Sequence, residues 1–438
     1  QEVSLVRMRE GIEVLKNDID ARLAFCFANK VIAQQFSWNE RRKDPSTKKV
    51  FNWYPYQIAF FLINVEPICN KGSKERETLD LLWVPTGGGK TETYMALMAF
   101  TMAYRRRHAI RTKNGDGRGT AIITRYTLRL LTVQQFRRTM RMITAAEWLR
   151  NLHNSCGTYG WLPQKCTVDD PWVYGSVRFS CGLWVGTDVT PNHLRKKNGA
   201  IDALKGLASE GEPAQLTRCP VCDSILSVTG KGLEEKRDHV IYWAVETSMD
   251  QVEVARSLNG EKFDNVHSID IIPLNQGHLI TLVVTIRSNK VVREGELDDI
   301  WEQIRTRCPH LRLRLVAIRA SRPGYVGIDL EKGRRAKTSH DFSDFEIICP
   351  NPKCDLNSLE GQYREDVMIT SERHAQKDRP CSTSVVMERG HPLLTSIPIP
   401  AYTVDEQIYH RCPTIIIGTV DKVARLPFEP RAASIVGN

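Results

Sequence analysis

A run of three glycines followed by Lys90 and Thr91 constrains the fold of this chain more than any other feature. It lies in "LLWVPTGGGKTETYMALMAF", residues 81–100, between an apolar segment and a segment of helical character. We predict a buried strand over Asp80–Val84 and a helix over Thr91–Tyr104. A strand, a glycine-rich turn and a helix N-terminus form a phosphate-binding loop, because glycines let backbone N–H groups converge on an anion and the helix end adds positive potential.

The residues of this loop have distinct predicted roles in holding a nucleotide. Lys90 is suited to neutralise the β- and γ-phosphates and Thr91 to place its hydroxyl on Mg²⁺, so both are candidate catalytic residues. The predicted ATP-binding set is the whole turn: Pro85, Thr86, Gly87, Gly88, Gly89, Lys90, Thr91 and Glu92. Val84 stands where the strict G-x-x-x-x-G-K-[ST] pattern has its first glycine. The alternative is a glycine-rich turn with a surface lysine, which does not explain why all these signals occur together.

The 438-residue chain has a net charge of +10, which favours a polyanionic partner, with nucleic acid as the first candidate. A basic surface without such a partner is the alternative. Downstream of the loop, "GTAIITRYTLRLLTVQQF" predicts a strand over Ala121–Thr124 followed by a helix. The side chains there that suit a nucleic-acid backbone are Arg125, Thr127, Arg129 and Gln135. A solvated helix face is the alternative for the arginines, and we interpret the basic stretch at residues 105–119 as a solvated loop.

Four of the twelve cysteines form two short knuckles, "RCPVCD" and "ICPNPKCD". Two such knuckles supply the four thiolates of a tetrahedral Zn²⁺ site, so the predicted ligands are Cys219, Cys222, Cys349 and Cys354. The pattern leaves no position for a catalytic water, so we expect a structural metal. Two unrelated turns with free thiols are the alternative. We expect a reducing compartment, and with neither a signal peptide nor an apolar run of about 20 residues we predict a cytoplasmic protein without a membrane partner.

The long separation between the knuckles predicts an inserted α+β module. Strand patterns occur at residues 266–274, 278–287 and 311–320, and a helical pattern with an acidic start occurs at 295–308. We therefore expect five parts: an N-terminal helical segment over 1–50, the first part of an ATP-binding domain over 51–215, a split zinc element over 216–229 and 346–360, the insertion over 230–345, and a return to the ATP-binding domain over 361–438.

Six motifs, in this order, resemble the helicase subunit of DISARM anti-phage defence systems, which is a superfamily 2 DNA helicase. They are "DLLWVPTGGGKTE", "RYTLRLLTVQQF", "GLWVG…TPN", "RCPVC", "YTVDEQIY" and "PTIIIGTVDKVARLPFEPRAASI". The resemblance covers about residues 51–222 and 347–438, and it leaves the insertion unexplained. Within it, "VPTGGGKT" is similar to the A-P-T-G-x-G-K-T form of the loop in superfamily 2.

The resemblance implies a RecA-like P-loop domain, a parallel sheet with helices on both faces, interrupted by the zinc element and the insertion. It implies an ATP-dependent DNA helicase or translocase that acts with a second defence protein on phage DNA, with ATP and Mg²⁺ as cofactors. Gln57 would read the adenine edge. Further side chains would contact the DNA backbone, independent of sequence: Thr187, Asn192, Thr419 and Lys422.

Parts of the superfamily pattern are not recognisable in this sequence. The Walker B acids and the second RecA-like domain with its arginine finger would follow residue 438, so we expect the N-terminal part of a longer protein. We interpret Asp405–Glu406 as the acidic first turn of a helix and not as the hydrolytic pair. The alternative function is a DNA-binding scaffold whose nucleotide is only a conformational ligand. A small-molecule kinase would not account for the "RYTLRLLTVQQF" and "PTIIIGTVDK" segments.

Overall fold

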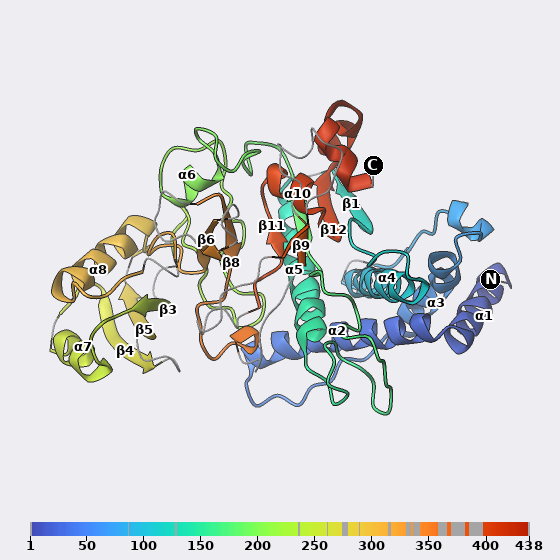
Figure 1. Ribbon diagram of the computed structural model, residues 1–438, viewed down its shortest axis with the longest axis horizontal. Coiled ribbons are helices and arrows are strands. Elements are labelled where there is room, and N and C mark those ends of the chain that lie inside the picture. Colours follow the sequence, from blue (N-terminus) through green and yellow to red (C-terminus); the bar gives the residue numbers. More distant parts are fainter. Residues whose placement is uncertain are drawn as a thin grey trace.

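The fold is built around one parallel sheet with a separate α+β module at one end of the molecule (Figure 1). The computed structural model describes residues 2–85, 87–127, 129–234, 237–260, 262–273, 279–288, 290–313, 317–329, 334–335, 342–357, 366–368, 382–384 and 397–436. No helix within these ranges is both long enough and apolar enough to cross a bilayer.

The central sheet has the strand order β1-β12-β2-β11, and every neighbouring pair is parallel. Its strands are β1 (Ile122–Tyr126), β12 (Ile415–Thr419), β2 (Cys181–Trp184) and β11 (Ala401–Tyr402). The chain therefore enters the sheet at β1 and completes it with strands about 290 positions later, since Ile122 pairs with Ile415.

Helices cover both faces of this sheet, as a parallel sheet requires. Alternate residues of one strand show it: Ile415 and Ile417 belong to the main core, whereas Ile416 packs in a second cluster. The main core also receives α2 (Ile19–Lys43), α4 (Lys90–Thr112) and α5 (Arg129–Asn151). The second cluster receives α10 (Asp405–Arg411) and α12 (Ala433–Val436), and the short α11 (Val420–Ala424) follows β12.

The N-terminal segment forms two helices, α1 (Glu2–Asn17) and α2, instead of one continuous amphipathic helix. The break is at Asp18, whose carboxylate accepts the N–H groups of Asp20 and Ala21 and so caps α2. Helix α1 packs on α3 (Pro55–Cys69), which is followed by the short turn η1 (Lys74–Glu77).

The predicted strand at Asp80–Val84 is wrong in this structure. These residues are extended, but they belong to no strand of the sheet, and Leu81 and Trp83 are 76% and 87% exposed. The predicted helix that follows is confirmed and runs further than expected, as α4. The predicted strand at 121–124 is confirmed as β1, and the parallel sheet and mixed α/β class are likewise confirmed.

The module between the cysteine knuckles has its own core around Trp243, Leu282 and Ile304. Its elements follow the order β3 (Arg237–Glu246), α7 (Gln251–Leu258), β4 (Val266–Pro273), β5 (Leu279–Ser288) and α8 (Glu294–Arg307). Strands β3, β5 and β4 form an antiparallel sheet in that order, and Arg312 bridges the free edge of β3 at Glu246. The order β-α-β-β-α, with one bridge beside β3 in the place of a fourth strand, is similar to the ferredoxin-like arrangement.

Smaller elements connect the module to the main sheet. Helix α6 (Ala200–Leu204) precedes the first cysteine knuckle, and β8 (Asp344–Ile347) leads into the second. Strand β8 pairs with β6 (Tyr325–Asp329), whose other neighbour is β7 (Arg334–Arg335). The turn η2 (Asp355–Asn357), the hairpin of β9 (Asp366–Met368) and β10 (Ser382–Ser384), and the turns η3 (Leu426–Phe428) and η4 (Pro430–Ala432) complete the described elements.

Candidate functional site

The glycine-rich loop ends directly at the N-terminus of α4. Gly87 and Gly89 have φ angles of 84° and 88°, in the left-handed region that glycine adopts without a steric penalty. Gly89 occupies the N-cap position and provides no side-chain cap, so the first-turn N–H groups of α4 have no intrahelical acceptor. Such groups, together with the helix dipole, form an anion site. Thr86, the second residue of the predicted ATP-binding set, lies outside the described residues.

Lys90 folds back over this loop. Its ammonium group donates to the backbone carbonyl of Val84 and, at 3.0 Å, to that of Pro85, which in turn accepts the N–H of Gly88 at 3.1 Å. These carbonyls are neutral acceptors, so an arriving phosphate would offer Lys90 a stronger, charge-assisted partner. The lysine is thus held beside the helix N-terminus, and it forms no ion pair with any residue that the structure describes.

The side chains of Tyr56 and Gln57 hold the loop from the α3 side. The hydroxyl of Tyr56 donates to the carbonyl of Gly88, and the amide of Gln57 donates to that of Gly89 at 2.8 Å. Gln57 also accepts the backbone N–H of Tyr54 at 2.8 Å and is only 2% exposed. In this structure the amide of Gln57 therefore positions the loop, and its adenine-reading role stays a prediction. Tyr54 stacks on Tyr56 and is itself 60% exposed.

Two further members of the predicted ATP-binding set connect α4 to α5. The hydroxyl of Tyr94 donates to Thr91 at 3.1 Å and lies 3.5 Å from the side-chain oxygen of Gln135. Glu92 forms an ion pair of 3.5 Å with Arg138. Gln135, predicted to contact nucleic acid, is thus placed beside the Mg²⁺-ligand candidate Thr91.

The ends of three parallel strands bring most of the predicted backbone-contact residues to one edge of the sheet. Arg125 on β1 lies opposite Gly418 on β12, and Gly418 lies opposite Trp184 on β2. The segments that leave these strands therefore emerge together, carrying Thr127, Thr419 and Thr187. Arg125, Thr127 and Thr187 are exposed, and Arg129 begins α5 just beyond. Crevices outside the carboxyl ends of parallel strands are the usual ligand sites of open α/β sheets.

The other candidates at this edge are held in a buried cluster. Lys422 donates to the carboxylate of Asp405 and, at 3.2 Å, to the side-chain oxygen of Asn192. Burial raises the pKa of Asp405 above its ordinary value against the opposing effect of Lys422. Thr419 is 2% exposed, so its side chain faces the protein. Asp405 opens α10, in agreement with its interpretation as part of an acidic first turn.

The four knuckle cysteines meet in one cluster although the two knuckles are far apart in the sequence. Their sulfur atoms all lie within 4.8 Å of one another, with Cys219–Cys354 at 3.9 Å and Cys222–Cys349 at 3.4 Å. Tetrahedral coordination with Zn–S bonds of about 2.3 Å requires sulfur separations of about 3.8 Å, so the cluster can bind a metal such as zinc. Hydrogen bonds from the neighbouring thiols lower the pKa of Cys222, whereas burial raises the pKa of Cys349, and thiolate is the form that binds a metal.

A buried charge network beside the cluster has no counterpart among the predicted residues. Arg178 forms a bidentate pair with Glu346 at 2.9 and 3.1 Å, and Arg411 contacts Asp344 at 2.5 Å and Glu346 at 3.3 Å. Gln407 donates to Asp344 at 2.6 Å. The network ties α10 and the segment before β2 to β8, the strand that leads into the second knuckle. No sequence spacing signals it, because its members come from distant segments.

Fold and site together define an α/β protein that combines a parallel sheet, a glycine-rich loop at a helix N-terminus and a four-cysteine cluster. No family model matches the sequence. DISARM protein DrmA from Bacillus paralicheniformis is 38% identical over 251 residues, which cover 54% of this chain and 20% of that protein. This similarity confirms the resemblance to a DISARM protein that the motifs indicate. The chain spans about a fifth of the length of this curated relative.

Proposed function

We propose that this chain carries the nucleotide- and DNA-binding elements of an ATP-driven superfamily 2 DNA helicase or translocase that acts in defence against phage DNA. The observation that carries the proposal is the glycine-rich loop at the N-terminus of α4, with Lys90 held on two neutral carbonyls. A triphosphate is bound by backbone N–H groups at a helix N-terminus and by a lysine whose other partners are neutral. The similarity to a protein named for the DISARM system supports the defence role.

The position of the backbone-contact candidates supports a DNA motor over a simple nucleotide-binding protein. Arg125, Thr127 and Thr187 are exposed at the edge where β1, β12 and β2 end. Helix α5 starts at this edge and contacts the first turn of α4 through Glu92–Arg138 and the Thr91–Tyr94–Gln135 chain. A change in the nucleotide at the loop would thereby reach the residues proposed to hold the strand. Contacts to the backbone make binding sensitive to salt and tolerant of sequence.

In this proposal the four-cysteine cluster holds one structural Zn²⁺ through Cys219, Cys222, Cys349 and Cys354. The sulfur separations fit thiolate coordination, and four protein ligands leave no open position for a reacting water. The metal would fix the two ends of the module against the main sheet, and a second defence protein is the proposed partner of the assembly.

The direct test is nucleotide binding and ATP turnover by the chain, with and without single-stranded DNA, beside Lys90→Ala. Lys48→Ala, at an exposed lysine that precedes α3, is the matched control. We expect ATP binding that Lys90→Ala weakens at least tenfold and Lys48→Ala leaves unchanged, since the lysine contributes a charge-assisted contact to phosphate. Turnover stimulated by DNA would show a complete catalytic set. ATP and DNA binding without turnover would assign the hydrolytic acids to another segment. If neither ligand bound, both the motor and the DNA-binding scaffold would be excluded.

A further inference from the structure

A second concentration of positive charge lies at the opposite end of α4 from the glycine-rich loop. A hollow of about 690 Å³ opens between the C-terminal half of α4, the turn after α3 and the glycine-rich segment at residues 113–118. Arg105, in its wall, follows Lys90 by 15 residues, which is about 22 Å along a helix axis. One nucleotide cannot span that separation, so the hollow and the loop are different sites.

Four cations line this hollow and only one carboxylate does. The cations are Lys71, Arg76, Arg105 and Arg118, and the carboxylate is Asp116. Asp116 is already engaged, because it accepts the side chain of Arg118 and, at 2.9 Å, its backbone N–H. The other three cations form no ion pair with a described residue that lines the hollow.

Those three cations have neutral partners or none. Arg105 donates to the backbone carbonyls of Thr120 and Arg118 at 2.6 and 2.9 Å, and Arg76 donates to that of Pro67 at 2.7 Å. No carboxylate lies within ion-pair distance of Arg76, Arg105 or Lys71 in the described part of the chain. Burial lowers the pKa of Arg105 against the opposing effect of the Asp116 charge.

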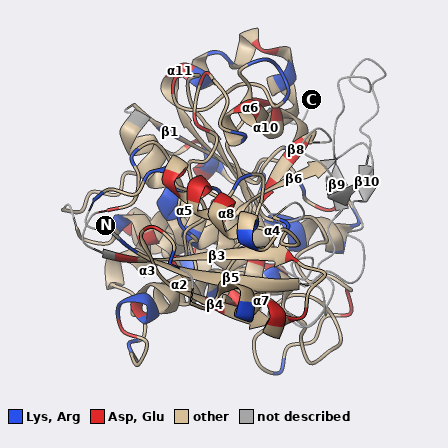
Figure 2. Ribbon diagram, turned by 90° about the vertical axis from the view of Figure 1, so that its left-hand side faces the viewer, with Lys and Arg blue, Asp and Glu red and all other residues tan. Residues whose placement is uncertain are grey.

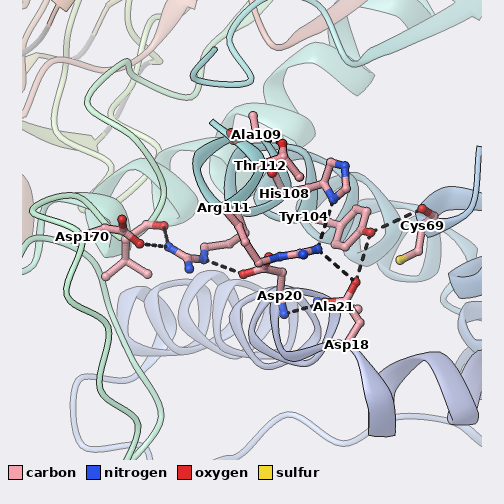
Figure 3. A network of polar contacts seen from close by, with 12 residues as sticks. Asp18, Asp20, Ala21, Cys69, Tyr104, His108, Ala109, Arg111, Thr112 and Asp170 are labelled. Carbon is pink, nitrogen blue, oxygen red and sulfur yellow. Dashed lines mark hydrogen bonds and ion pairs between the residues drawn. The ribbon is translucent and has the colours of Figure 1, made fainter. Parts of the chain in front are cut away.

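A separate network of acidic and basic groups joins α2 to the face of α4 that carries Tyr104 (Figure 3). Asp20 is fully buried and pairs with Arg107 at 3.1 Å and with Arg111. Asp18 accepts the hydroxyl of Tyr104 at 3.2 Å. This network holds α4 on α2 and supplies the floor of the hollow, where Tyr104 and His108 lie on one face of α4. None of these contacts involves Lys71, Arg76 or Arg105.

The sheet of the inserted module differs from this end of α4, since β3, β4 and β5 carry few charges (Figure 2). A volume of about 690 Å³ is in the range of small-molecule sites. The planar guanidinium group of arginine matches phosphate oxygens in geometry and charge.

We propose that this hollow is a second anion site, which binds a phosphate-bearing ligand of nucleotide size through Lys71, Arg76 and Arg105. The phosphate can come from a free nucleotide or from one unit of a DNA strand, and the chemistry of recognition is the same for both. The site is independent of the proposed nucleotide loop and does not require that loop to bind ATP.

The test uses the full chain carrying Lys90→Ala, so that the glycine-rich loop does not contribute. Binding of ATP and of a short single-stranded oligonucleotide is measured by calorimetry at low salt, for this parent and for the added pair Lys71→Gln and Arg76→Gln. Lys74→Gln is the matched control, because Lys74 is an exposed cation of the same turn that does not line the hollow. We expect the pair to weaken binding at least about tenfold, as loss of charge-assisted contacts does, and the control to leave it unchanged.

The two ligands distinguish the source of the phosphate. If the Lys71→Gln and Arg76→Gln pair weakens the binding of ATP alone, the ligand of the hollow is a free nucleotide. If the pair weakens the binding of the oligonucleotide alone, the ligand is a DNA strand. Either outcome supports the site. Arg76→Lys keeps the charge but not the planar guanidinium, so it should lose less binding than Arg76→Gln, and this graded loss would reflect charge and not misfolding. Equal affinity in the pair and the Lys74→Gln control would overturn the proposal. So would a Lys90→Ala parent that binds neither ligand.

Discussion

Arg7 of α1 holds the carboxylate of Asp80 with two hydrogen bonds of 2.7 Å, across 73 positions of sequence. The same guanidinium contacts Glu75 at 3.2 Å and the carbonyl of Ile63 at 3.2 Å. Asp80 begins the extended segment that leads into the glycine-rich loop. The N-terminal helix therefore fixes the point from which the proposed phosphate site departs.

Replacing Arg7 with alanine should lower the free energy of unfolding by about 1–3 kcal/mol, because a mostly buried bidentate pair loses one partner. Arg9→Ala, at an exposed arginine of the same helix, should change it by less than about 0.5 kcal/mol. Urea unfolding of both variants checks the prediction. Equal effects would show that Arg7 acts only through helix content.

Gly11→Ala should destabilise the protein, although alanine is the better helix former. A Cβ at this position would lie 2.1 Å from the carbonyl oxygen of Leu62, so α1 and α3 would have to separate. Overpacking of this kind costs about 1–3 kcal/mol and exceeds a propensity gain of about 1 kcal/mol.

Gly295→Ala in α8 provides the matched comparison. Nothing lies within 4 Å of a Cβ at that position, so the propensity term acts alone and should stabilise by about 0.5–1 kcal/mol. Thermal unfolding of the two variants should shift in opposite directions. A stabilising Gly11→Ala would mean that the α1–α3 contact is looser than described.

Removal of the proposed metal should destabilise the junction between the sheet and the inserted module. We expect one zinc per chain by elemental analysis, and a loss of stability on chelation of about 3 kcal/mol relative to zinc at a hundredfold excess over Kd. Cys349→Ser should abolish the zinc and the response to chelator. Cys156→Ser, at an exposed thiol outside the cluster, should retain both. A wild-type chain purified without metal that shows no response to added zinc would contradict the assignment.

Stability should fall in acid through Glu346. Burial raises the pKa of this carboxyl, but Arg178 and Arg411 outweigh that effect and leave the pKa below its ordinary value of 4.5. A depressed folded-state pKa gives stability that is present above the unfolded-state pKa and is lost as pH falls through the folded-state value. The loss therefore begins below about pH 4.5.

Glu346→Gln should consequently be less stable than the wild type at pH 7 and should have a shallower acid limb. Unfolding midpoints measured between pH 3 and 7 give both quantities. Glu302→Gln, at an exposed glutamate of α8, should keep the wild-type slope. An unchanged slope in Glu346→Gln would assign the acid sensitivity to other carboxylates.

Local signals in the sequence predicted the helix after Gly89 and the acidic start of α10. In each case the relevant residues are adjacent in the chain. The cysteine knuckles were predictable for a related reason: each pair has ligand spacing by itself, so only their meeting had to be inferred. The ion pairs of Arg7 and Arg411 were not predictable, because a single sequence does not say which distant charges come together.

The segment at Asp80–Val84 shows where apolar pattern misleads. Residues 81–84 form an unbroken apolar run, as in a buried strand, yet no described strand lies beside them. An apolar run indicates a tendency to be buried, and the neighbour that buries a strand is set by tertiary structure. The first strand of the module, β3, was not predicted from the sequence. It begins with the charged residues Arg237 and Asp238, although Trp243 further along the strand lies in the module core.

The sulfur atoms of Cys222 and Cys349 are in contact although the two residues are 127 positions apart in the sequence. Closing a flexible chain of that length costs about 4 kcal/mol of entropy, whereas doubling its length adds only about 0.6 kcal/mol. A metal held by the four cysteines would fix the two ends of the module whatever the length of chain between them. Insertions or deletions within the module are therefore nearly neutral for the sheet, and relatives should differ most in length between the two knuckles.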